Sequence, residues 1–383
     1  MSFSPLGLSS TLLNTLYKQN YQSPYPIQKE LIPHVLKHED ILGIAKTGSG
    51  KTASYVLPIL TQLQQQNKNK NRHVDVLVLV PTRELAIQVV SVFKTFSADF
   101  QEPIKSLAVY GGVSINPQMI ALQNVRILVA TPGRLLELVE SKAVHLSKIE
   151  TLVIDEADKM LNLGFKEEMG RIFKLLPVLR QNLLFSATLS ENLTAIKEVL
   201  LKDPIIVNIE EKQNAFEQIS QIAYLVSEEK KGPLLRYIIK KENLKQTLIF
   251  VSSGHRADIV AKKLMKNGIF AISIHGKQSQ GARTKVLNQF KEGKIQVLVA
   301  TDLLARGVDI IDLPSVINYE LPRSPKDYIH RIGRTGRADA SGQAISLISP
   351  EEEHHFKVIQ KKMGKWVDVI DSSNIELFNS VKK

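Results

Sequence analysis

The chain has 383 residues, of which 43% are hydrophobic, and it contains no cysteine. This length exceeds what one hydrophobic core usually supports, so we expect two domains. The lack of cysteine excludes disulfides and thiolate metal sites, so any metal must bind oxygen or histidine.

Two further properties of the sequence limit where the protein can be located and what it can bind. The sequence contains no apolar run long enough to cross a membrane and no signal-peptide pattern after Met1, so we expect a cytoplasmic protein without a membrane partner. The formal net charge is +12, with the larger basic excess in the second half of the chain, which favours a polyanionic partner. Solvated surface lysines are the alternative explanation of that charge.

Short apolar runs alternate with helical patterns along the whole chain and predict buried parallel strands. In the first half they span residues 41–45, 76–80, 107–110, 127–130, 151–154, 183–186 and 205–209. After a polar stretch, a second series spans residues 222–226, 247–251, 271–275, 296–300, 316–319 and 344–348. Helical patterns in this second half include residues 255–266, 281–291 and 351–362.

These patterns predict an α/β fold with two tandem doubly wound parallel-sheet domains. We place the first domain at residues 1–208, a linker at 209–217 and the second domain at 218–383. In an open parallel sheet the carboxyl ends of the strands form the ligand crevice, so motifs that follow the strands should gather at one edge.

Residues 45–52 read Ala-Lys-Thr-Gly-Ser-Gly-Lys-Thr and separate a predicted strand from a helical pattern. Small residues there let backbone N–H groups surround phosphate oxygens at a helix N-terminus. We expect Lys51 to contact the β- and γ-phosphates and the Thr52 hydroxyl to hold Mg²⁺. The remaining cradle residues are Ala45, Thr47, Gly48, Ser49 and Gly50. The alternative to a phosphate loop is an ordinary Gly-Ser turn before a helix that begins with lysine. Other motifs in the chain must decide between the two interpretations.

Asp155, Glu156 and Asp158 follow the predicted strand at residues 151–154, with Ala157 between them. Asp155 can hold Mg²⁺ through water, and Glu156 can orient and deprotonate an attacking water. The alternative is a helix N-terminus enriched in acidic residues.

With these motifs the chain resembles the DEAD-box ATP-dependent RNA helicases, a family named after the tetrapeptide at residues 155–158. The resemblance covers residues from about 3 to 349, and the compact form without a long basic tail resembles bacterial members. It implies two RecA-like domains, ATP and Mg²⁺ as cofactors, and RNA as a partner bound independently of its sequence. Targeting to a particular RNA would come from the core or from a partner protein.

The resemblance also assigns residues to the nucleotide. Gln28 belongs to an adenine-reading motif, with Phe3 as its more distant aromatic member, and Tyr25 stands where the family usually has threonine. This substitution puts one hydroxyl contact in doubt. Asp302 is expected to meet the ribose or nucleotide.

Residues 330–337 read His-Arg-Ile-Gly-Arg-Thr-Gly-Arg, in which Arg334 and Arg337 resemble arginine fingers. For Arg331, both a solvated basic turn and an RNA phosphate patch remain open. Short hydroxyls at Ser186 and Thr188 are expected to bond Asp158 and His330, which links the acidic motif to the second domain.

The residues expected to contact RNA follow predicted strands in both domains. Helix N-termini, glycine backbones and single arginines suit phosphates rather than base edges. The first domain supplies Pro81, Thr82, Arg83, Gly112, Thr131, Pro132, Gly133 and Arg134. The second domain supplies Arg256, Gly276, Arg283, Thr301 and Gly307. Arg256 and Arg283 are the weaker candidates, because an isolated arginine is usually a surface charge.

Together the motifs predict an ATP-dependent RNA helicase, an RNA-stimulated ATPase that unwinds short duplexes or remodels RNA–protein complexes. The alternative is an ATP-gated RNA clamp or assembly scaffold with little unwinding activity. A DNA-directed helicase of related architecture is a more distant alternative.

Overall fold

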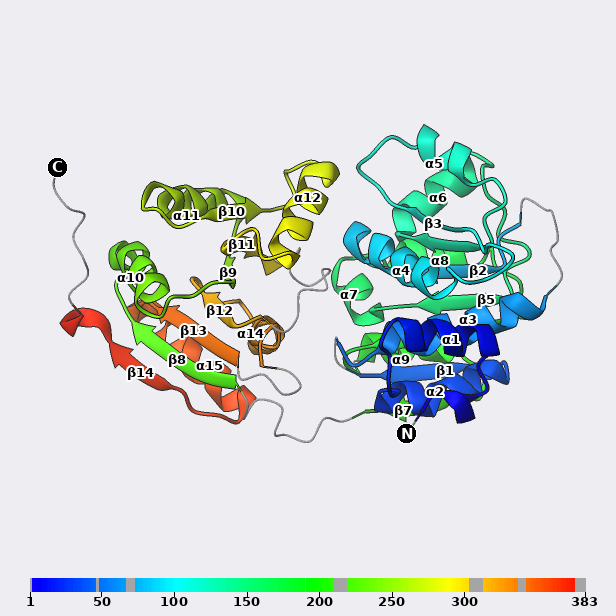
Figure 1. Cartoon of the computed structure of the whole chain (residues 1–383), viewed down its shortest axis with the longest axis horizontal. Helices are drawn as coiled ribbons and strands as arrows, with labels where there is room; N and C mark the ends of the chain where they lie inside the picture. The colour runs from blue at the N-terminus through cyan, green and yellow to red at the C-terminus, as the bar shows by residue number, and fades with distance from the viewer. Residues whose placement is uncertain are drawn as a thin grey trace. The chain divides into compact units, whose positions relative to one another are not determined.

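A computed structural model describes residues 2–45, 48–66, 73–189, 191–209, 219–302, 313–336 and 342–375. The chain forms two compact units, Met1–Glu210 and Glu211–Lys383. Each unit contains a seven-stranded sheet in which every pairing is parallel, with helices over its faces (Figure 1). The predicted fold class is therefore confirmed. The expected linker lies, apart from Ile209, outside the described residues, so the domain boundaries stay a prediction.

The sheet of the first unit has the order β3-β4-β2-β5-β6-β1-β7. Its strands are β1 (Ile41–Ile44), β2 (Val76–Leu79), β3 (Ser106–Val109), β4 (Ile127–Ala130), β5 (Thr151–Ile154), β6 (Gln181–Ser186) and β7 (Ile205–Asn208). Its helices are α1 (Ser10–Lys18), α2 (Pro26–Leu36), α3 (Lys51–Gln65), α4 (Arg83–Phe96), α5 (Asn116–Ala121), α6 (Pro132–Glu140), α7 (Ala157–Asn162), α8 (Lys166–Phe173) and α9 (Glu191–Leu200).

Strand β2 shows why the apolar runs of the sequence do not alternate with polar residues. Successive side chains point to opposite faces of a strand, so Val76 and Val78 join one core while Leu77 and Leu79 join the other. The first core includes residues of α1 to α4, and the second includes residues of α6 to α9. Because both faces are covered, a continuous apolar run is the expected sequence of such a strand.

The sheet of the second unit has the order β10-β11-β9-β12-β13-β8-β14. Its strands are β8 (Ile219–Leu225), β9 (Thr247–Val251), β10 (Ala271–Ile274), β11 (Val297–Thr301), β12 (Ser315–Asn318), β13 (Gly342–Ile348) and β14 (Asp368–Asp371). Its helices are α10 (Glu228–Lys241), α11 (Gly254–Lys266), α12 (Gln280–Lys291), α14 (Pro325–Ile332) and α15 (Glu353–Met363), the last preceded by a 3-10 turn, η3 (Pro350–Glu352).

The expected strands and helices lie within a few residues of the observed ones, whereas β14 was not expected. All four of its residues are exposed at the edge of the sheet, so it lacks the apolar run that marks the other strands. Among the described residues, no helix is long and apolar enough to cross a membrane.

Candidate nucleotide and RNA site

The phosphate loop connects β1 to α3. Gly48 and Gly50 have φ angles of +84° and +87°, in the left-handed region that glycine adopts without steric cost. Ala45, Ser49 and the two glycines lie in this turn, and Thr47 lies outside the described residues. The glycines therefore let the chain turn sharply before α3, and phosphate binding by this loop stays a prediction.

Lys51 begins α3 and has only 7% of its surface exposed. Its Nζ donates a hydrogen bond to the backbone oxygen of Ala45. Burial lowers the pKa of Lys51, while the negative charges of Asp155, Glu156 and Asp158 act in the opposite direction. The fold thus brings the loop lysine and the acidic motif into one electrostatic environment.

Asp155 follows β5 and is 2% exposed. The hydroxyl of Tyr55, which is fully buried in α3, donates to its Oδ2 at 2.9 Å, and Thr52 also hydrogen-bonds to Tyr55. Burial and the neighbouring Glu156 raise the pKa of Asp155 to about 6, against the opposing effect of Lys51. A buried carboxylate beside a hydroxyl fits a Mg²⁺ site, because a cation relieves the cost of burying the charge.

Glu156 occupies a strained position at the start of α7, with a φ of +54°. Its side chain is nearly buried, and Oε1 accepts a hydrogen bond from Nζ of Lys159 at 2.6 Å. The other oxygen, Oε2, is buried and accepts no hydrogen bond from any described residue. A buried acceptor without a partner is costly unless a ligand or water completes it, which fits a base for an attacking water.

The segment after β6 contacts the acidic motif through one of its two expected hydroxyls. Thr188 Oγ1 donates to Asp158 Oδ2 over 3.4 Å, and the backbone N–H of Ala187 reaches Asp158 Oδ1, also over 3.4 Å. Ser186 Oγ instead donates to the backbone oxygen of Thr188 at 2.8 Å. These two contacts to Asp158 are long for hydrogen bonds, and they place the segment beside the acidic motif.

Gln28 is 1% exposed, and its amide joins α2 to the phosphate loop. Its Oε1 accepts from the Tyr25 N–H at 3.0 Å, and its Nε2 donates to the Gly50 oxygen at 3.0 Å. Tyr25 is 51% exposed, and its ring lies close to Gly50, whereas Phe3 is buried in the core. Adenine contacts by Gln28 and Phe3 stay predictions. In the structure Gln28 links α2 to the phosphate loop by hydrogen bonds, and Phe3 packs in the core.

The expected RNA residues of the first unit follow β2, β3 and β4. Thr82 caps α4 by accepting from the Leu85 N–H at 3.3 Å. A Cβ built on Gly112 would lie 1.8 Å from Nη2 of Arg83, so this guanidinium lies directly over the glycine. Pro81, Thr131 and Pro132 are buried, and Gly133 lies in the first turn of α6.

Arg134 is 5% exposed and bonds the residue that follows Gly112. Its Nη2 donates to the backbone oxygen of Val113 at 2.8 Å, and its Nε donates to Glu137 Oε2 at 2.7 Å. Arg83 and Arg134 thus meet around Gly112. Arg134 holds this segment in place whether or not it also contacts RNA.

The order of the strands separates these two sets of residues. The residues expected to bind the nucleotide follow β5, β6 and β1, which are neighbours in the sheet. The residues expected to contact RNA follow β3, β4 and β2, which are also neighbours. The two sets of expected residues therefore lie on adjacent parts of the carboxyl edge of one sheet, and their ligands stay predictions.

In the second unit, Arg331 is 2% exposed and forms a bidentate ion pair with Asp302. Nε meets Oδ1 at 2.5 Å and Nη2 meets Oδ2 at 2.7 Å, while Nη1 donates to Asn318 Oδ1 at 3.1 Å and to the Glu320 oxygen at 2.6 Å. Arg331 is therefore neither a solvated basic turn nor an exposed phosphate patch. Asp302 is engaged in this pair, and its nucleotide contact stays a prediction.

In the segment after α14, Arg334 is 4% exposed and is held by hydrogen bonds of its backbone. Its backbone N–H donates to the Arg331 oxygen at 3.2 Å, and its oxygen accepts from Leu313 N–H at 3.0 Å. His330 is partly exposed in the last turn of α14. Arg337 and Gly307 lie outside the described residues.

The remaining candidates of the second unit differ in exposure. Gly276 is exposed and Thr301 is half-buried at the end of β11. Arg283 is 5% exposed, so it is not the surface charge that an isolated arginine usually is. Arg256 is 34% exposed and pairs with Glu228 and with Glu320, the latter at 2.9 Å from Nε to Oε1.

Sequence reasoning missed Tyr55, Lys159 and Glu320. The first two carry a usable signal, because Tyr55 lies four residues after Lys51 on one helix and Lys159 lies three residues after Glu156. Glu320 contacts residues more than sixty positions away, and no local pattern marks it.

A phosphate loop and a buried acidic pair at the carboxyl edge of a parallel sheet define a class of nucleoside triphosphate-hydrolysing proteins. Two family models match the chain: "DEAD/DEAH box helicase" over residues 25–196 and "Helicase conserved C-terminal domain" over residues 229–339.

Two similar curated proteins are the ATP-dependent RNA helicase CshA of Listeria monocytogenes and the DEAD-box ATP-dependent RNA helicase CshA of Bacillus cereus. The first is 38% identical over 95% of this chain and 69% of its own length, and the second is 38% identical over 98% and 70%. The chain belongs to the DEAD-box ATP-dependent RNA helicase family.

Solved structures agree with this assignment. S. cerevisiae Dbp5 bound to RNA and ADP BeF3 matches with a TM-score of 0.85 and 30% identity, over 97% of this chain and 96% of that chain. A DEAD box protein from the hyperthermophile Methanococcus jannaschii matches with a TM-score of 0.55 and 35% identity, over 97% and 99%.

Proposed function

We propose that this protein is an RNA-stimulated ATPase that couples ATP binding and hydrolysis to RNA binding and local duplex unwinding in the cytoplasm. The observation that carries the proposal is the gathering of Lys51, Asp155 and Glu156 beside the Arg83–Gly112 contact, along the edge of one sheet. The relatives named as ATP-dependent RNA helicases, and the neighbour solved with RNA and ADP BeF3, support it.

The ATP phosphates bind the N-terminus of α3 and the loop before it. Backbone N–H groups there and the helix dipole favour negative charge. The γ-phosphate replaces the Ala45 oxygen as the partner of Lys51 Nζ, which otherwise bonds within the loop. Thr52 and Asp155 would hold Mg²⁺, which when bound with ATP neutralises charge on the phosphates.

Glu156 orients the attacking water and accepts its proton at Oε2, the oxygen that accepts no hydrogen bond from any described residue. Lys159 keeps the carboxylate in place through Oε1. We assign Arg334 and Arg337 as arginine fingers, whose charge at any working pH suits the transferring γ-phosphoryl group.

RNA binds through its backbone. Thr82 and Thr131 precede the N-termini of α4 and α6, which favour phosphate oxygens, and Arg83 over Gly112 adds a cation. Contacts of this kind carry no base information, so binding is independent of sequence. Ribose 2′-hydroxyl contacts and backbone shape would select RNA over DNA.

The assignment of the base is tested with Glu156→Gln, which keeps the shape of the side chain but cannot accept the proton as a carboxylate does. Steady-state ATP hydrolysis should fall by about 100-fold or more, while ATP-dependent RNA binding persists. Glu167→Gln, an exposed change on the neighbouring helix α8, is the matched control and should leave both unchanged. Normal turnover in Glu156→Gln would refute the assignment.

An RNA clamp would have the same nucleotide site, so a strand-displacement assay separates the two functions. The helicase should release the labelled strand of a short RNA duplex in the presence of ATP. A clamp should bind the duplex or its overhang and release no strand.

A further inference from the structure

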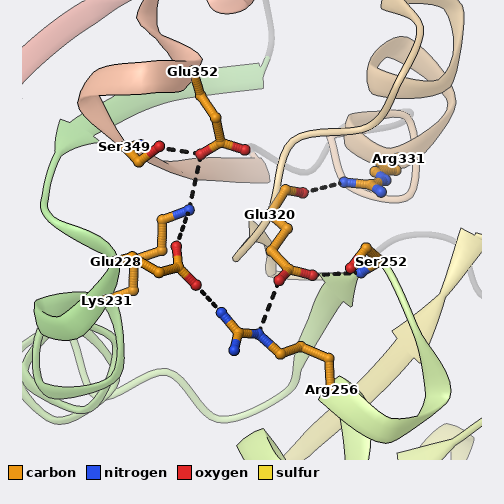
Figure 2. Close-up of polar contacts among 8 residues, drawn as sticks. All are labelled: Glu228, Lys231, Ser252, Arg256, Glu320, Arg331, Ser349 and Glu352. Atoms are coloured by element: carbon orange, nitrogen blue, oxygen red, sulfur yellow. Dashed lines mark hydrogen bonds and ion pairs between the residues drawn. The ribbon is translucent and has the colours of Figure 1, made fainter.

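Glu320 follows β12 and joins three elements of the second unit, as Figure 2 shows. Its Oε2 accepts from the Ser252 N–H at the end of β9 at 2.6 Å, and its Oε1 accepts from Arg256 Nε on α11 at 2.9 Å. Its backbone oxygen accepts from Arg331 Nη1 on α14 at 2.6 Å. One residue therefore bonds both an expected RNA contact and the arginine that precedes the proposed finger.

Each of the two arginines bonded to Glu320 has further partners. Arg331 is held by Asp302 and Asn318 and stacks over the Phe250 ring, with Cζ 4.9 Å from its centroid. Arg256 lies over the Tyr319 ring, with Cζ 5.9 Å from its centroid. Since Tyr319 and Glu320 are adjacent in the chain, a shift of Arg256 acts on one short segment that also supports Arg331.

Arg331 in turn sets the position of the segment that follows α14. Its backbone oxygen accepts from the Arg334 N–H at 3.2 Å, so the two residues belong to one continuous turn. The Arg331 side chain is only 2% exposed, so it can move only together with these partners.

We propose that Glu320 is a positioning residue that couples RNA binding at Arg256 to the placement of the finger Arg334. The inference rests on the proposed function, because it presumes that RNA stimulates ATP hydrolysis. An RNA phosphate that binds Arg256 pulls on its guanidinium and, through Nε, on the Glu320 carboxylate. The backbone oxygen of Glu320, which bonds Arg331 Nη1, passes this shift to the turn that carries Arg331 and Arg334.

Glu228 offers a comparison within the same network, because it also binds Arg256 but, among the residues that the structure describes, makes no bond to α14. It pairs with Nη2 of Arg256 and, at 3.0 Å, with Nζ of Lys231, a residue only 1% exposed. A phosphate on Arg256 competes with Glu228 for this side of the guanidinium, while the bond from Nε to Glu320 remains. Glu228 therefore affects RNA affinity, whereas Glu320 affects coupling.

The experiment compares full-length Glu320→Gln, Glu320→Asp and Glu228→Gln with the unchanged protein. The readouts are the ATPase kcat at saturating single-stranded RNA, the rate without RNA, the KM for ATP and the Kd for RNA. In Glu320→Gln the ratio of RNA-stimulated to basal rate should fall about tenfold at unchanged KM for ATP, because the finger is misplaced only slightly. Glu320→Asp keeps the charge and should recover part of the ratio.

Glu228→Gln should keep the ratio within about twofold and tighten RNA binding, because RNA loses a competitor for Arg256. Equal ratios in both Glu320 variants and the unchanged protein would overturn the proposal, as would an equal loss in Glu228→Gln. If Glu320→Gln fails to fold, the Glu320→Asp ratio decides. An unchanged protein that RNA does not stimulate would refute the proposed function itself, which is a separate outcome.

Discussion

Replacing Arg331 should destabilise the second unit, although this arginine belongs to the same motif as the proposed fingers. Arg331→Met keeps the length and apolar stem but removes the guanidinium. It leaves Asp302, the Asn318 amide oxygen and the Glu320 backbone oxygen without their partner. Breaking a buried ion pair from one side costs about 3–5 kcal/mol, because the remaining charge stays buried.

The exposure of Asp302 places the expected cost at the lower end of this range. Its side chain is 29% exposed, so water recovers part of the lost interaction. We expect about 3 kcal/mol, which for a unit of this size corresponds to a decrease in Tm of roughly 6–12 °C. Arg331→Lys should cost less but still be clearly measurable, because an ammonium cannot replace a bidentate pair.

Guanidinium-induced unfolding followed by circular dichroism measures this cost, and hydrogen exchange on peptides of residues 219–375 assigns it to the second unit. Arg323→Met is the matched control, since Arg323 is exposed shortly before the same helix. A free energy of unfolding for Arg331→Met within about 0.5 kcal/mol of this control would refute the structural role of Arg331.

Two glycine substitutions test how closely the backbone approaches its neighbours. Gly112→Ala should weaken RNA binding about tenfold in a filter-binding assay, because its Cβ would lie 1.8 Å from Arg83 Nη2. Gly111→Ala is the control and should bind RNA normally, because a Cβ at Gly111 would have no atom within 4 Å. Equal RNA affinities of the two variants would contradict the packing of Arg83 over Gly112. Gly342→Ala should lower Tm by several degrees and reduce RNA-stimulated ATPase, because its Cβ would lie 2.2 Å from the Gly336 nitrogen. Wild-type Tm and turnover in that variant would refute the close approach.

Much of the fold could be predicted because its strands are buried on both faces. A short, β-branched-rich apolar run such as residues 76–79 favours the centre of a covered parallel sheet. The motifs that follow such strands are then expected at the carboxyl edge of the sheet. Strand β14 escaped prediction because its exposed residues provide no apolar run and its pairing with β8 is set by tertiary structure.

The candidate site was predictable where chemistry requires contiguous residues, as in the phosphate loop and at Asp155 and Glu156. It was not predictable where partners come from distant parts of the chain. Tyr55 reaches Asp155 across 100 positions, and Arg331 reaches Asp302 across 29. Burial also changed the interpretation of Arg331, which the sequence alone left open between a solvated turn and a phosphate contact.

We propose that ATP hydrolysis and RNA binding are coupled in this chain. The most direct test is ATP hydrolysis by the full-length protein with and without a single-stranded RNA, alongside the matching DNA and a short RNA duplex. We predict that RNA raises the rate at least about tenfold, that DNA does not, and that the duplex is unwound only with ATP. An ATPase rate that RNA leaves unchanged would show that hydrolysis and RNA binding are not coupled.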